Sequence, residues 1–174
     1  MFNSMSSQSR RGSRARSLMA AGVAGAMLLW PGIGVSETAG SPFAAFVGSW
    51  RGSGQATIKD GHRERITCRA TYTGSDSGQS LTISLVCASD SYRFNVESYV
   101  EAQGQNIHGH WEEITRKVQG DLTGRVDGGQ FKGTVNGGAF SVLMSIRATP
   151  NAQEVSMVPQ GADVTDLEVV LKRQ

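Results

Sequence analysis

Residues 46–58 read Phe-Val-Gly-Ser-Trp-Arg-Gly-Ser-Gly-Gln-Ala-Thr-Ile (FVGSWRGSGQATI), and this stretch decides the fold. From Phe46 onward every second residue is apolar or glycine, and the residues between them are mostly polar. Because successive side chains of a strand point to opposite faces, the alternation predicts a strand with one apolar and one solvated face. Glycine on the inner face allows a strand to bend sharply, as a small closed barrel requires.

Short alternating segments separated by turn residues continue to the end of the chain. Val126-Asp127-Gly128-Gly129 and Val135-Asn136-Gly137-Gly138 are typical of tight hairpin turns. No segment after residue 46 shows a helical period. The pattern therefore predicts an all-β, up-and-down antiparallel barrel of 8–10 strands that occupies residues 46–174 as a single domain.

The N-terminal region has the composition of a signal peptide. Four arginines lie within the first 17 residues, and an uninterrupted apolar run of 13 residues follows from Leu18 to Trp30. Small residues at Gly34 and Ser36 suit a signal peptidase. We expect residues 1–36 to be removed, residues 37–45 to form a short linker, and the protein to be periplasmic or secreted, meeting the membrane only transiently.

Charge and cysteine content agree with export. The signal region carries four of the 17 basic residues and none of the 15 acidic ones, which leaves the remainder at a net charge of −2. We therefore expect no nucleic-acid partner.

If residues 66–72 and 81–87 form a hairpin, Cys68 faces Cys87, and the sequence predicts a disulfide between them. A pair of free thiols and a set of metal ligands are the alternatives.

Gly48-Ser49-Trp50 on the first strand and Lys172-Arg173 at the end of the last resemble the calycin group. That group comprises lipocalins, fatty-acid-binding proteins, avidins and small periplasmic metalloprotease inhibitors. The resemblance implies that Trp50 closes one end of the barrel and that Lys172 or Arg173 packs on it. It also implies binding of a small ligand or of a protein target.

Inward-facing aromatic residues suggest two alternatives, a cavity for an apolar ligand or a filled core. Glu113 shares the face of Trp111, so it either contacts a ligand or is a structural buried group, with Arg147, Tyr72 or Ser98 as a possible partner. The predicted ligand-binding residues are Trp50, Tyr72, Tyr92, Phe94, Trp111, Glu113 and Phe140.

His108, His110 and Glu112 share the opposite face of the same segment, and two imidazoles with a carboxylate can bind zinc. The competing interpretation is a solvated strand face, where polar residues are usual. No cofactor fingerprint or catalytic motif occurs, and we expect neither a cofactor nor enzyme activity. The sequence thus predicts an exported non-enzymatic protein that binds a small apolar or amphipathic ligand, with a protease inhibitor second and a zinc-binding protein third.

Overall fold

The computed structural model describes residues 40–174, and the predicted signal peptide lies outside this range. The described chain forms ten antiparallel strands in one closed barrel, in which each strand pairs with its neighbours in sequence and β1 pairs with β10. The strands are β1 (Gly48–Ile58), β2 (Arg63–Gly74), β3 (Ser80–Ala88), β4 (Arg93–Gln103), β5 (Asn106–Glu113), β6 (Val118–Asp127), β7 (Gln130–Asn136), β8 (Ser141–Ala148), β9 (Ala152–Gln160) and β10 (Val164–Arg173). The predicted all-β meander barrel is confirmed.

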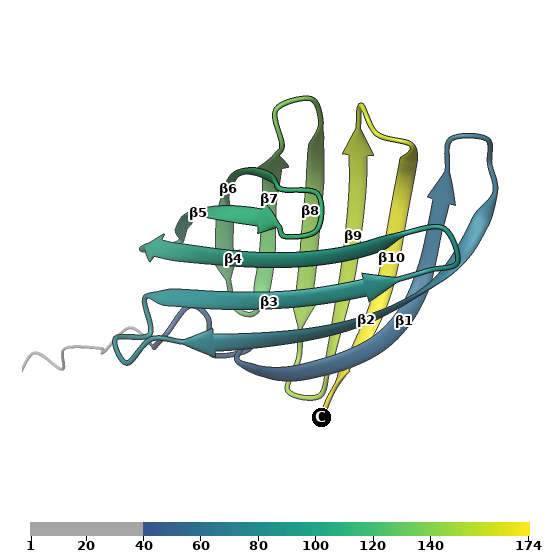
Figure 1. Cartoon of the computed structure of the whole chain (residues 1–174). Coiled ribbons are helices and arrows are strands. Elements are labelled where there is room, and N and C mark those ends of the chain that lie inside the picture. The colour runs from purple at the N-terminus through teal and green to yellow at the C-terminus, as the bar shows by residue number, and fades with distance from the viewer. Residues whose placement is uncertain (1–39) are drawn as a thin grey trace, which may run out of the picture. The chain divides into compact units, whose positions relative to one another are not determined.

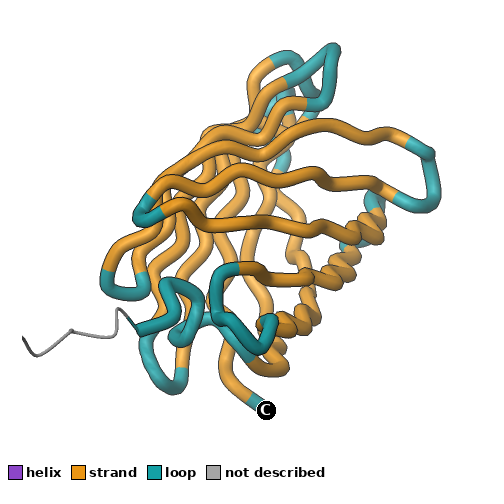
Figure 2. Tube along the Cα trace, turned by 90° about the vertical axis from the view of Figure 1, so that its left-hand side faces the viewer, coloured by secondary structure: helices purple, strands orange, loops and turns teal. Residues whose placement is uncertain are grey.

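The barrel is flattened, so that β2, β3 and β4 cross in front of β7, β8 and β9 at a steep angle (Figure 1). Figure 2 shows that short turns join the strands and that the chain enters among the turns at one end. Within residues 40–174 no helix is long and apolar enough to cross a membrane.

The glycines of β1 form the corner that closes the barrel. β1 pairs with β2 on one side and with β10 on the other, and it curves strongly between these two layers (Figure 1). A methyl group at Gly52 or Gly54 would overlap the main-chain carbonyl oxygen of Val170 or Glu168 on β10. Glycine is therefore required here because the neighbouring backbone approaches too closely for any side chain.

One end of the barrel is closed by the segment that precedes β1. Phe43 and Phe46 are buried, and the Trp50 indole, which is 1% exposed, donates a hydrogen bond to the Phe46 carbonyl at 2.8 Å. The Arg173 guanidinium lies over the Trp50 ring and also donates to the carbonyls of Val47 and Pro150. Lys172 is exposed, so Arg173 is the basic residue that packs on Trp50.

The hairpin of β2 and β3 has the predicted register. Cys68 pairs directly with Cys87, their Cα atoms are 4.1 Å apart, and the two residues form a disulfide. The predicted bridge is confirmed, and it fits an oxidising environment outside the cytoplasm.

Candidate ligand-binding cavity

The interior of the barrel contains a cavity of about 430 Å³. Its walls are almost entirely apolar, and several inward-facing side chains remain only half-buried because they border this space. These half-buried wall residues are Ile83, Leu85, Val96, Val142, Met144, Ile146 and Met157. Of the two interpretations left open by the sequence, a hollow barrel and a filled core, the structure has the hollow one.

The cavity reaches one end of the barrel, which we call the mouth. The mouth is the end formed by the turns β1–β2, β3–β4, β5–β6, β7–β8 and β9–β10. The lining includes Tyr92, Arg116, Phe140 and Asp163 from four of those turns. The opposite end is the one closed by Phe43, Phe46, Trp50 and Arg173, and of these only Phe46 borders the cavity. A ligand would therefore enter between the turns and extend toward Phe46.

Six of the seven predicted ligand-binding residues line this cavity, namely Tyr72, Tyr92, Phe94, Trp111, Glu113 and Phe140. Trp50 does not, because it is covered by Arg173 at the closed end. The prediction of Trp50 as a ligand contact is corrected for this reason. Two aromatic pairs shape the wall: Tyr92 and Phe94 stack with ring centroids 6.2 Å apart, and Trp111 contacts Phe140 at 5.9 Å.

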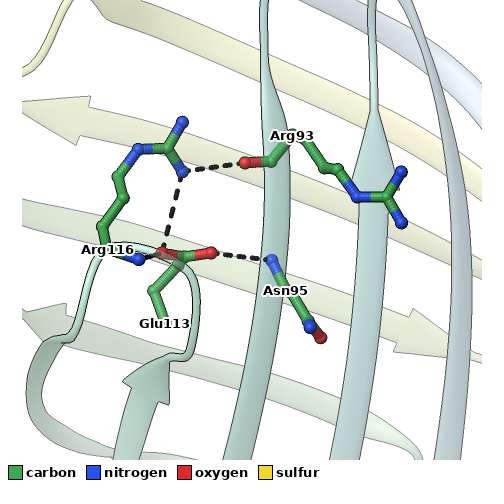
Figure 3. A network of polar contacts seen from close by, with 4 residues as sticks. All are labelled: Arg93, Asn95, Glu113 and Arg116. Atoms are coloured by element: carbon green, nitrogen blue, oxygen red, sulfur yellow. Dashed lines mark hydrogen bonds and ion pairs between the residues drawn. The ribbon is translucent and has the colours of Figure 1, made fainter.

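Glu113 is buried at the mouth, and its carboxylate accepts main-chain hydrogen bonds (Figure 3). The N–H of Asn95 on β4 donates at 3.0 Å and that of Arg116 in the β5–β6 turn at 2.6 Å. Burial raises the pKa of Glu113, but these bonds and those from Thr115 outweigh it, so the pKa lies below its ordinary value. The hydrogen-bond donors are main-chain N–H groups of Asn95 and Arg116 rather than Arg147, Tyr72 or Ser98, and the carboxylate orders the turn.

Arg116 also lines the cavity, although it is not among the predicted ligand-binding residues. Its Nη1 donates to the carbonyl of Arg93 at 2.8 Å and lies 3.7 Å from the Glu113 carboxylate (Figure 3). Its Cζ is 5.9 Å from the centre of the Phe94 ring. The one signal in the sequence was the spacing of Glu113 and Arg116, which suits a turn held by a carboxylate.

Two other ionisable groups have shifted pKa values. Burial raises the pKa of Tyr72 to about 12, so its phenol stays neutral in the wall.

Hydrogen bonds from Ser89 and Ser91 lower the pKa of Glu64, which holds the β3–β4 turn in the same way that Glu113 holds the β5–β6 turn. Both carboxylates therefore position turns at the mouth.

His108, His110 and Glu112 lie on the outer face of β5 and are exposed. The Nε2 atom of His108 lies 3.4 Å from the Glu101 carboxylate on β4, whereas the Nδ1 atom of His110 lies 3.9 Å from the Asp121 carboxylate on β6. Within the described residues no three such side chains are grouped closely enough to hold a metal ion. The structure thus gives the zinc hypothesis no site.

The described part of the predicted linker packs against the barrel. The Ser41 hydroxyl donates to the carbonyl of Gly78 in the β2–β3 turn at 2.7 Å, and Phe43 is buried. Residues 41–47 therefore form part of the closed end of the barrel rather than a protruding segment.

Comparison with protein-family models and with curated protein sequences finds no match. Among solved structures, the barrel is similar to that of an S-type phycobiliprotein lyase, CpeS, from Guillardia theta, with a TM-score of 0.54 and 15% sequence identity. The match covers 76% of this chain and 89% of the lyase. At this identity the likeness shows the fold alone, an antiparallel β-barrel.

The comparison corrects one expectation. We expected a protein without enzyme activity because no catalytic motif occurs in the sequence, yet a protein with this fold is a lyase by name. The architecture therefore gives no ground for excluding catalysis. What the two structures have in common is a barrel, and the chemistry of this chain must be argued from its own cavity.

Proposed function

We propose that this protein is exported and binds a small, largely apolar molecule inside its barrel, which enters through the mouth. The observation that carries the proposal is the cavity of about 430 Å³ together with its half-buried apolar walls. Pockets of roughly 300–1,000 Å³ with apolar walls and few polar groups are typical of small-molecule sites. Leaving such side chains beside an unfilled space costs stability, so a ligand that covers them gains binding free energy.

The disulfide and the turns at the mouth hold the wall of the cavity in place. The disulfide links β2 to β3, whose inward-facing residues Ile83 and Leu85 form part of the wall. Two turns at the mouth, β3–β4 and β5–β6, are held by the carboxylates of Glu64 and Glu113. The opening thus keeps a defined shape while the interior remains available.

The test is binding of the neutral fluorescent probe N-phenyl-1-naphthylamine, with two matched variants of β8. Met144 borders the cavity, whereas the adjacent Leu143 is 56% exposed on the outer face. We expect Met144→Trp to fill the cavity and weaken probe binding about tenfold, and Leu143→Trp to leave it unchanged. Urea denaturation of both variants checks that the barrel remains folded.

The proposal fails if the wild-type protein does not bind the probe, or if the two variants behave alike. Native mass spectrometry of the protein purified from its own host provides an independent measurement. A bound small molecule released on unfolding supports the proposal and identifies its chemistry.

A further inference from the structure

We infer that the ligand carries a carboxylate, which binds Arg116 at the mouth while the apolar part of the ligand fills the cavity. This inference rests on the proposed function, and it specifies the class of ligand. The charged residues that line the described cavity are Glu113, Arg116 and Asp163, and Arg116 alone is a cation. Because the remaining walls are apolar, a charged group of a ligand can be accommodated only at the mouth.

The guanidinium of Arg116 is held in place by its surroundings. Its Nη1 donates to the Arg93 carbonyl, and the group lies over the Phe94 ring with 5.9 Å between Cζ and the ring centre. Phe94 in turn stacks on Tyr92 with an angle of 4° between the rings. A cation fixed by a carbonyl and an aromatic ring loses little side-chain entropy when an anion binds to it.

Arg116 also retains the capacity to bind an anion. Glu113 forms an ion pair with the guanidinium at 3.7 Å, but the same carboxylate also accepts two main-chain N–H groups at 3.0 and 2.6 Å, and these bonds share its negative charge. Both contacts of the guanidinium use Nη1, so they do not engage the edge formed by Nε and Nη2. That edge can donate two parallel hydrogen bonds to one carboxylate, and the side chain is 49% exposed.

The acidic residue Asp163 would favour the opposite ligand, an amphiphile with a cationic head. Asp163 lies in the exposed β9–β10 turn, where its main-chain carbonyl accepts from Lys59. Arg116, by contrast, is fixed beside the Phe94 ring, which borders the cavity. The observations therefore favour the anionic head.

The experiment measures displacement of N-phenyl-1-naphthylamine by three ligands with the same chain: dodecanoate, 1-dodecanol and dodecylamine. We expect the wild type to bind dodecanoate more tightly than dodecanol, and Arg116→Gln to weaken dodecanoate about tenfold while dodecanol changes less than about twofold. Lys117 is the next residue of the turn and does not line the cavity. Lys117→Gln removes one positive charge there and should change the affinity for neither dodecanoate nor dodecanol. Arg116→Lys keeps the positive charge but not the planar guanidinium, so its affinity for dodecanoate should lie between those of the wild type and of Arg116→Gln.

The outcomes separate the two proposals. If the probe does not bind the wild type, the proposed function fails and the carboxylate inference fails with it. If the probe binds but Arg116→Gln weakens dodecanoate and dodecanol equally, or neither, only the carboxylate inference is overturned. Preference for dodecylamine, lost in Asp163→Asn, would also overturn it, and unchanged probe affinity in Arg116→Gln shows that the cavity is intact.

Discussion

The guanidinium of Arg173 lies over the indole of Trp50, with 4.2 Å between its Cζ atom and the ring centroid. These residues are 123 positions apart in the sequence, yet they pair directly where β1 meets β10. Arg173 also donates to the carbonyls of Ala45, Val47 and Pro150, so a single side chain joins the pre-β1 segment, the last strand and the β8–β9 turn. The first and last strands are thus fastened at the closed end.

Replacing Arg173 with alanine should lower the free energy of unfolding by about 2 kcal/mol, because it removes the contact with Trp50 and leaves carbonyl groups without donors. Arg173→Lys should lose part of this, since an ammonium cannot span the same carbonyls. Urea denaturation measures both, with exposed Lys172→Ala as the control. Equal midpoints for Arg173→Ala and Lys172→Ala would show that the contact contributes nothing.

Gly54→Ala should destabilise the barrel by about 2–3 kcal/mol, because the added methyl group would overlap the carbonyl oxygen of Glu168. The strand would have to move away from β10 and weaken the pairing that closes the barrel. Gly40→Ala is the control, since an added methyl group there meets no atom within 4 Å. Thermal unfolding of the two variants distinguishes a close approach of backbones from a general effect of losing glycine.

The barrel could be predicted because inward and outward residues alternate along each strand, and this is a local property of the sequence. The pairing of Cys68 with Cys87 followed from the same alternation and a short turn. The same alternation could also have identified Arg173, rather than Lys172, as the residue that packs on Trp50. Leu167, Val169 and Leu171 point inward, and Arg173 continues their face. Alternation is a reliable guide wherever one face of a strand is buried.

The cavity could not be predicted, because its volume depends on how side chains from many strands fill one space. Met144 and Val142 read as ordinary core residues, and only the closed structure shows that they border an opening. Arg116 was missed for a related reason. Its position depends on the β5–β6 turn, which the Glu113 carboxylate holds through main-chain contacts, and inward–outward alternation does not reveal such contacts.

Gln153→Met should stabilise the protein by about 1–2 kcal/mol. Gln153 is fully buried, and neither polar atom of its amide has a hydrogen-bond partner among the described residues. An unpaired buried amide costs free energy that an unbranched apolar side chain of similar shape would not. Gln160→Met on the exposed face of the same strand is the control, measured by urea denaturation, and a loss of stability in Gln153→Met would mean that the amide is satisfied after all.

Removing the disulfide should cost about 3 kcal/mol in the chain-entropy model, since the bridge joins residues 19 apart in sequence. The Cys68→Ala/Cys87→Ala double variant and the wild type are compared by urea denaturation, each with and without a reducing agent. The reducing agent should lower the midpoint of the wild type only. A wild type that is unaffected while fully reduced would show that the bridge is not needed for stability.

Glu113 should make the stability depend on pH below neutrality. Its pKa is lower in the folded protein than in the unfolded chain, so the unfolded chain binds a proton more readily. The contribution of the carboxylate is complete above its unfolded pKa of about 4.3 and is lost as the pH falls through the lower folded value. Glu113→Gln should therefore flatten the curve of stability against pH between about 5 and 3. The neighbouring Glu112→Gln, on the exposed face, should leave the curve unchanged, and identical curves for all three proteins would contradict the role of Glu113 in holding the turn.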